Sequence, residues 1–122
     1  MRFAPDSNPN VNFLRGYEDG VLRINADSFD SAMIVTAASL RAEPKLHSVL
    51  DLNLEHAARM LELNPELVLL GTGRRQTFPP AFFGAEFLQR GIGFEVMDTG
   101  AACRTFNLLV SERRQVTGLL LV

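Results

Sequence analysis

The sequence predicts one α/β domain in which an N-terminal β-hairpin is followed by helices and strands in the order αβαβαβ. Asp19-Gly20 lies between two short apolar runs, which is typical of a two-residue hairpin turn with positive φ values. From Asn53 to Val122, segments with helical periodicity alternate with short apolar runs, as expected for parallel strands joined by helices. A length of 122 residues, 47% of them hydrophobic, suits a single core without a domain boundary.

The first half of the chain is expected to consist of a lead-in and short strands. Residues 1–12 are polar and contain two prolines, which predicts a loosely ordered lead-in. Strands are expected next at four places, residues 14–17, 21–24, 32–36 and 40–43. Pro44 interrupts the last strand, and residues 44–52 are expected to form a loop with some extended character.

The second half is expected to begin with a helix capped by Asn53 and stopped by Asn64-Pro65. Apolar residues at i, i+3, i+4 and i+7 predict a core-facing stripe on this helix, made of Leu54, Ala57, Ala58 and Leu61. A continuous apolar run at residues 67–70 predicts a strand buried on both faces. Further strands are expected at residues 94–97 and, strongly apolar, at residues 116–122.

The other two helices are expected at about residues 79–90 and 100–113. In the earlier helix, Phe83 and Phe87 share one face. Gly84 and Ala85 form a face of small residues that allows close packing. The later one is apolar over more than half its circumference. It is therefore expected to pack on two sides, between layers or at an oligomer interface.

Composition excludes several classes of protein. No apolar run approaches the roughly 18 residues needed to span a bilayer, and the N-terminus lacks an export signal. Cys103 is the single cysteine, which excludes an intramolecular disulfide and fits a reducing compartment. We therefore expect a cytoplasmic protein without membrane insertion. The net charge is −2, and the 12 basic residues are scattered, so nucleic acid is not an expected partner.

The candidate site lies in two loops at the carboxyl ends of predicted strands. In open α/β sheets, ligands bind where such loops turn into helices. The first loop, residues 71–76, has two glycines that expose backbone N–H groups and two arginines suited to an anion. The second loop, residues 98–100, opens onto a helix N-terminus. The candidate ligand-binding residues are Gly71, Thr72, Gly73, Arg74, Asp98, Thr99 and Gly100.

A purely structural role is the alternative for these residues, with glycines that only turn the chain and Asp98 that only caps a helix. The Gly-x-Gly pair lacks the third glycine of a dinucleotide site, and no Lys-Ser or Lys-Thr follows, so no cofactor is predicted. Cys103 is expected to be buried and inert rather than a reactive thiol. His47 lies in an ambiguous loop and His56 is expected to face solvent, so the sequence indicates neither a metal site nor a catalytic set.

An ordered series of motifs spans the C-terminal half of the chain: Leu69-Leu70-Gly71-Thr72-Gly73, Phe78-Pro79-Pro80, Gly91-Ile92-Gly93, Glu95-Val96-Met97-Asp98-Thr99 and Ala101-Ala102-Cys103-Arg104-Thr105-Phe106-Asn107. The series resembles a family of small domains of unknown function whose relatives include mitochondrial respiratory complex I assembly factor 3 and an adipogenesis-associated cytoplasmic protein. The resemblance implies a three-layer architecture with a mixed central sheet. It implies no established enzymatic activity and no known cofactor. Phe106 stands where tyrosine is frequent in the family, so no role for a hydroxyl is expected there.

Two functional hypotheses follow from these observations. The first is a binding or assembly module that acts through contacts with another protein, as the resemblance implies for the mitochondrial relative. The second is a binder of a small anionic metabolite, or an enzyme acting on one, that uses the loops at 71–76 and 98–100. The absence of a convincing catalytic set favours the first. The apolar final strand and the third helix also suggest a homo-oligomer.

Overall fold

The N-terminal hairpin is part of a small antiparallel sheet. The computed structural model describes residues 10–122, so residues 1–9 of the expected lead-in lie outside the described part. The sheet has the order β1-β2-β3, with bounds Leu14–Glu18, Val21–Ile24 and Asp27–Phe29. Asp19 and Gly20 have φ values of 53° and 75°, which confirms the predicted turn. The third strand was not predicted from the sequence.

The main sheet is mixed and has five strands in the order β5-β4-β8-β6-β7. Their bounds are Leu40–Glu43 for β5, Ala32–Val35 for β4, Val116–Leu121 for β8, Leu67–Thr72 for β6 and Gly93–Met97 for β7. Strand β8 pairs antiparallel with β4 and parallel with β6, while β6 pairs parallel with β7. The mixed sheet confirms the architecture that the family resemblance implies.

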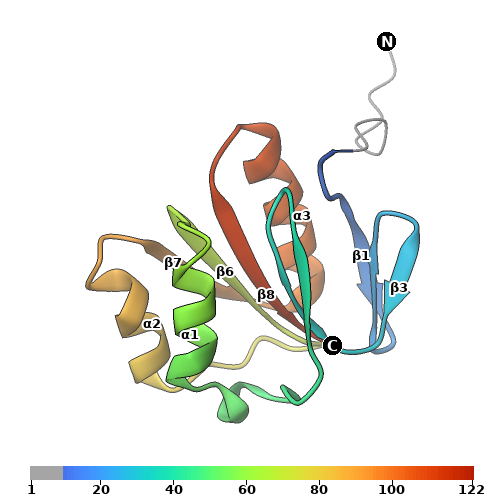
Figure 1. Cartoon of the computed structure of the whole chain (residues 1–122). Coiled ribbons are helices and arrows are strands. Elements are labelled where there is room, and N and C mark those ends of the chain that lie inside the picture. Colours follow the sequence, from blue (N-terminus) through green and yellow to red (C-terminus); the bar gives the residue numbers. More distant parts are fainter. Residues whose placement is uncertain (1–9) are drawn as a thin grey trace.

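Helices cover both faces of the main sheet, as Figure 1 shows. Helices α1 (Leu54–Leu61) and α2 (Ala81–Leu88) lie on one face, and α3 (Thr99–Ser111) lies on the other. Helix α3 contacts β6 and β8 on one side and β1 of the small sheet on the other. The prediction that the third helix packs on two sides, between layers, is confirmed.

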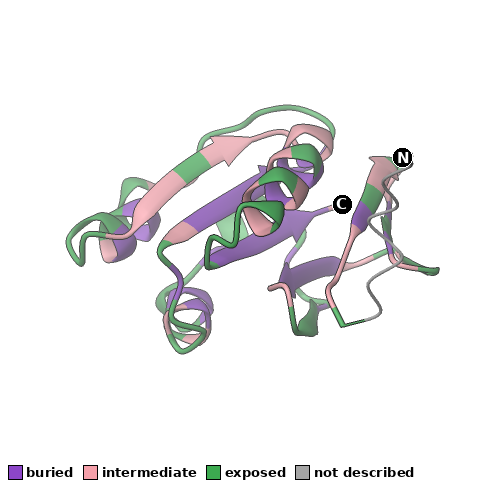
Figure 2. Cartoon of the chain, turned by 90° about the horizontal axis from the view of Figure 1, so that it is seen from above, coloured by how far each residue is buried: buried purple, intermediate pink, exposed green. Residues whose placement is uncertain are grey.

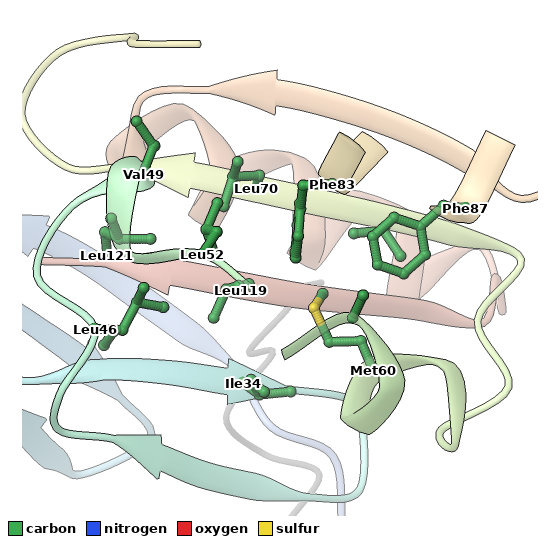
Figure 3. Close-up of a cluster of buried hydrophobic side chains, with 13 residues drawn as sticks. Ile34, Leu46, Val49, Leu52, Met60, Leu70, Phe83, Phe87, Leu119 and Leu121 are labelled. Carbon is green, nitrogen blue, oxygen red and sulfur yellow. The ribbon is translucent and has the colours of Figure 1, made fainter. Parts of the chain in front are cut away.

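Two hydrophobic clusters fill the spaces between these layers. One lies between the main sheet and helices α1 and α2, where Phe83 and Phe87 pack against Leu70 and Leu119 (Figure 3). The other surrounds Phe106 of α3 and joins the main sheet to the small sheet. Figure 2 shows the buried central strands between more exposed outer elements. In residues 10–122, no helix is both long and apolar enough to cross a membrane.

The predicted apolar stripe of α1 is partly wrong. Leu54 and Ala58 are exposed, while the buried residues of α1 are His56, Ala57 and Met60. The helix is rotated so that His56 faces inward, with its ring directed toward the Glu43 carboxylate. On α2, the two phenylalanines and Gly84 are buried as predicted, but Ala85 is exposed.

The residues expected to form a loop at 44–52 include a short 3-10 helix, η2 (Val49–Asp51). Ser48 caps this helix, since its side chain accepts the N–H of Leu50, while the Asp51 carboxylate accepts the N–H groups of His47 and Ser48. Both N–H bonds hold the pKa of Asp51 below its usual value. This Ser-x-x-Asp spacing is visible in the sequence and indicates a helix start that the apolar pattern does not reveal.

Candidate functional site

The two predicted loops lie side by side at one edge of the main sheet. Strands β6 and β7 are neighbours in parallel register, with Gly71 opposite Met97. The backbone N–H of Thr99 donates to the carbonyl of Gly73 at 2.9 Å. The backbone N–H of Gly73 donates in turn to Thr99 Oγ1 at 2.7 Å. The structure therefore brings residues 71–73 and 98–100 together.

The space between the loops is filled by the Thr99 side chain, which is completely buried. Its hydroxyl accepts from Gly73 and donates to the carbonyl of Leu121 at 2.6 Å. A Cβ atom on Gly71 would lie 2.9 Å from Thr99 Oγ1 and 3.0 Å from Thr99 Cα, so only glycine fits at this contact. Thr99 thus links three chain segments from inside the junction.

The side chains of Thr72 and Asp98 also have partners within the protein. Thr72 Oγ1 donates to the carbonyl of Arg75 at 2.5 Å and accepts the N–H of Thr77 at 3.1 Å. Asp98 is the N-cap of α3, and its carboxylate accepts the N–H of Ala101 at 2.9 Å. Arg74 and Arg75 are exposed at this edge. The surface left for an anion therefore consists of two arginines beside a helix N-terminus.

Cys103 lies one turn into α3 and is buried in the cluster around Phe106. Burial raises the pKa of its thiol to about 12, against a smaller lowering effect of Arg104. Because the thiolate is the reactive form, this pKa favours the inert thiol predicted from the sequence.

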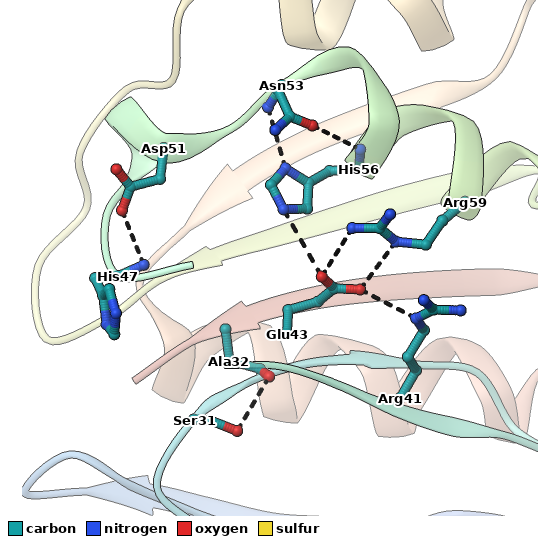
Figure 4. A network of polar contacts seen from close by, with 9 residues as sticks. All are labelled: Ser31, Ala32, Arg41, Glu43, His47, Asp51, Asn53, His56 and Arg59. Atoms are coloured by element: carbon teal, nitrogen blue, oxygen red, sulfur yellow. Dashed lines mark hydrogen bonds and ion pairs between the residues drawn. The ribbon is translucent and has the colours of Figure 1, made fainter. Parts of the chain in front are cut away.

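A cluster of charged residues that the sequence did not reveal joins β5 to α1 (Figure 4). Glu43 is buried at the end of the edge strand β5. Its carboxylate accepts two hydrogen bonds from Arg59, from Nε at 3.0 Å and from Nη2 at 2.9 Å. Arg41 Nε lies 3.3 Å from the same carboxylate, and His56 Nε2 lies 3.8 Å from it. Because 16 residues separate Glu43 from Arg59, no local motif indicates this contact.

His56 is buried, so the expectation that it faces solvent is wrong. Its Nδ1 accepts the N–H of Asn53 at 3.1 Å, while the Asn53 side chain accepts the N–H of His56 at 3.0 Å. This reciprocal cap requires an unprotonated Nδ1 and places the ring proton on Nε2, toward Glu43. The cap and the carboxylate together explain why His56 rather than Leu54 lies on the inner face of α1.

The His56 cap predicts that the protein loses stability below about pH 6.5, the ordinary pKa of histidine. Burial lowers the pKa of His56, against the opposing effect of Glu43, so the unfolded chain binds this proton more readily than the folded one. The contribution of unprotonated His56 to the free energy of unfolding is therefore complete above about pH 6.5. It decreases as the pH falls from there through the pKa of His56 in the folded state. Urea unfolding from pH 7.5 to 5 should show this decrease in the wild type and a smaller one in His56→Gln. The same decrease in both proteins would contradict the assignment, and His47→Gln is the control because His47 is exposed.

Exposed apolar side chains are concentrated in α1, α2 and the segments that precede these helices. Of the eight large hydrophobic side chains exposed in residues 10–122, five lie in these helices or just before them. We call these five the α1–α2 surface: Leu50, Leu54, Phe78, Phe82 and Leu88, which are 40% to 80% exposed. On α3, by contrast, Leu108 is the one such residue. Figure 1 shows α1 and α2 side by side, so the three of these residues that lie in the two helices, Leu54, Phe82 and Leu88, belong to one layer. Leu50 lies in η2, which precedes α1, and Phe78 lies in the loop that precedes α2.

The chain is similar to known proteins in both sequence and fold. One relative is the 13 kDa major membrane protein of Francisella tularensis subsp. holarctica, 29% identical over 110 residues, which are 89% of each chain. Another is NADH dehydrogenase (ubiquinone) 1 alpha subcomplex assembly factor 3 of Xenopus tropicalis, 35% identical over 106 residues. That match covers 84% of this chain and 56% of the frog protein, so the chain spans little more than half of that relative.

The fold is shared with solved structures. The NMR structure of a protein from Xanthomonas campestris superposes with a TM-score of 0.84 at 35% sequence identity, covering 99% of this chain and 89% of the other. The sequence match to a family model covers most of the domain, and it includes both loops of the candidate site. The chain belongs to the family described as "Protein of unknown function (DUF498/DUF598)", whose model matches residues 14–121.

Proposed function

We propose that this chain is an assembly-type domain that binds another protein through the α1–α2 surface. The observation that carries the proposal is the exposure of Leu54, Phe82 and Leu88 on two adjacent helices, with Leu50 and Phe78 exposed in the segments that precede them. Exposed apolar patches on a folded domain mark interaction sites, because burying them in a complex removes apolar area from water. The relationship to assembly factor 3 agrees with a role in assembling a larger complex.

The cellular location is part of the same proposal. We propose that the domain acts in the cytoplasm, on the ground of its single, buried cysteine. The Francisella relative is named a membrane protein, which is compatible with a domain that works beside a membrane by binding a protein there.

Site-specific photo-crosslinking in the source cells tests the proposed surface. A photoreactive phenylalanine analogue at position 82 or 88 is expected to give a discrete adduct with another protein, identified by mass spectrometry. The analogue at position 108 is the matched control, because Leu108 is about as exposed as Leu88 but lies on α3 (58% against 59%). Phe82→Asp should abolish the adduct formed from position 88.

The crosslinking outcomes separate the competing explanations. Equal adducts from all three positions, or none from positions 82 and 88, would contradict the proposed surface. An adduct made only of two copies of this chain would identify the surface as a homo-oligomer interface instead.

Binding of an anionic metabolite at residues 71–76 and 98–100 is the second proposal. Its support is the exposure of Arg74 and Arg75 beside the N-terminus of α3. Two observations weigh against it. The N–H of Gly73 is already bonded to Thr99, and the Asp98 carboxylate would repel an anion placed beside it. Protein binding is therefore the function that we favour.

A further inference from the structure

We infer that the partner presents an amphipathic helix to the α1–α2 surface, with an apolar face over α2 and a row of basic side chains over α1. This inference rests on the proposed function, and it adds the chemistry of the partner's docking element.

Helix α2 lacks the polar outer face that a surface helix normally has. Its inner face packs on the core through Phe83, Gly84 and Phe87. Its outer residues are also largely apolar and exposed, namely Ala81, Phe82, Ala85 and Leu88, with Glu86 as the one charged residue of the helix. A helix that is apolar on all sides is usually buried on all sides. In the isolated domain only the inner side of α2 is covered, so the outer side has the composition of a contact surface.

The geometry of the layer suits a helix better than an extended segment. Helices α1 and α2 lie side by side with their N-terminal ends at the same edge of the molecule (Figure 1). Two adjacent helices present rows of side chains spaced three and four residues apart, between which the side chains of a third helix can pack. Phe82 and Ala85 on α2 have this spacing, as do Leu54 and Ala58 on α1, and all four are exposed.

The charge of α1 selects a basic partner. Glu55 of α1 and Glu62, the C-cap residue with helical backbone angles, are both exposed. They are seven residues or about two turns apart and therefore lie on the same outward face. Neither forms an ion pair within residues 10–122, whereas Arg59, the one arginine or lysine of α1, is paired with Glu43. On α2, Glu86 is paired with Arg90. The layer thus combines an apolar helix with an adjacent helix whose outward charge is negative, and complementary charge steers a partner to such a surface.

A membrane surface is the other class of partner that an apolar patch could fit. Anionic lipid headgroups attract clusters of basic residues. The unpaired outward charges of α1 and its C-cap are acidic instead, so such a surface would repel this layer. The charges therefore favour a protein helix over a lipid bilayer.

Two synthetic helical peptides of about 18 residues, or five turns, test the inference by calorimetry with the whole chain. Both carry the same Leu/Ala face, one with lysines and the other with glutamates beside it. The lysine peptide is expected to bind more weakly as salt rises. Glu55→Lys/Glu62→Lys should weaken its binding about tenfold, or about 1.4 kcal/mol. The control, Glu18→Lys/Glu112→Lys, changes two exposed acidic residues outside α1 and α2 and should leave binding unchanged.

Each remaining outcome counts against the inference. Equal binding of both peptides would overturn the charge preference. If neither peptide binds but position 82 gives a crosslinked protein adduct, the inference that the partner presents a helix would be wrong, while the proposed function would stand. Binding to vesicles of anionic phospholipid that Phe82→Asp abolishes would assign the surface to a membrane, and self-association that Phe82→Asp abolishes would assign it to a second copy.

Discussion

Thr99→Val is expected to lower the free energy of unfolding by about 3 kcal/mol, although valine has the shape of threonine and is more apolar. The hydroxyl of Thr99 satisfies the N–H of Gly73 and the carbonyl of Leu121 in a fully buried position. Valine leaves both groups without their partner, and each buried unpaired group costs about 1 to 3 kcal/mol. Thermal unfolding should show a midpoint lower by roughly 10 °C for a domain of this size.

Thr99→Ser is the matched control for this substitution. Serine retains the hydroxyl and loses one methyl group, which costs about 1 kcal/mol. Serine should therefore be tolerated better than valine. If valine were as stable as the wild type, or more stable than serine, the two hydrogen bonds would not be holding the junction between the loops.

Glu43→Gln is expected to lower the free energy of unfolding by about 2 kcal/mol. Removing one partner of a buried ion pair typically costs about 3 to 5 kcal/mol, and the expected value is smaller here because Arg59 is partly exposed (27%). Glutamine has nearly the size of glutamate but accepts only one of the two Arg59 bonds. The loss should appear in urea unfolding at pH 7.5, where the cap at His56 is intact.

A double-mutant cycle assigns this loss to the contact with Arg59. Arg59→Met should cost much less in the Glu43→Gln background than in the wild type, because the interaction is already lost. Glu55→Gln, an exposed change on the same helix, should stay within about 0.5 kcal/mol of the wild type. Additive effects of the two substitutions would show that the buried carboxylate does not connect β5 to α1.

Local signals explain which elements could be predicted from the sequence. Asp19-Gly20 predicted the hairpin because the turn needs positive φ values, and these residues have them. The third helix begins at Thr99 because Asp98 caps it, and it ends at Ser111, shortly before Arg113 adopts a φ of 63°. The helix ends predicted from the sequence lie within about two residues of the observed ends, because the signals that start and stop a helix come from neighbouring residues in the chain.

The parts that could not be predicted depend on contacts between distant residues. The stripe on α1 was misplaced because periodicity gives Leu54 and His56 no information about Glu43, which lies on another element. The two loops were expected to meet, and they do, because parallel strands end at the same edge of a sheet. That Thr99 fills the space between them follows from its bond to Leu121, which no local pattern indicates. Ligand binding at these loops stays a prediction.

The position of β8 has a consequence for the kinetics of folding. β4 and β6 are not paired with each other, so β8 is the strand that joins the antiparallel and parallel halves of the main sheet. Its pairing with β4 closes a loop that contains most of the chain, and the entropy of closing that loop is lost before the contacts form. High contact order of this kind slows folding. We therefore expect refolding to be limited by the docking of β8, with the helices and the hairpin forming earlier.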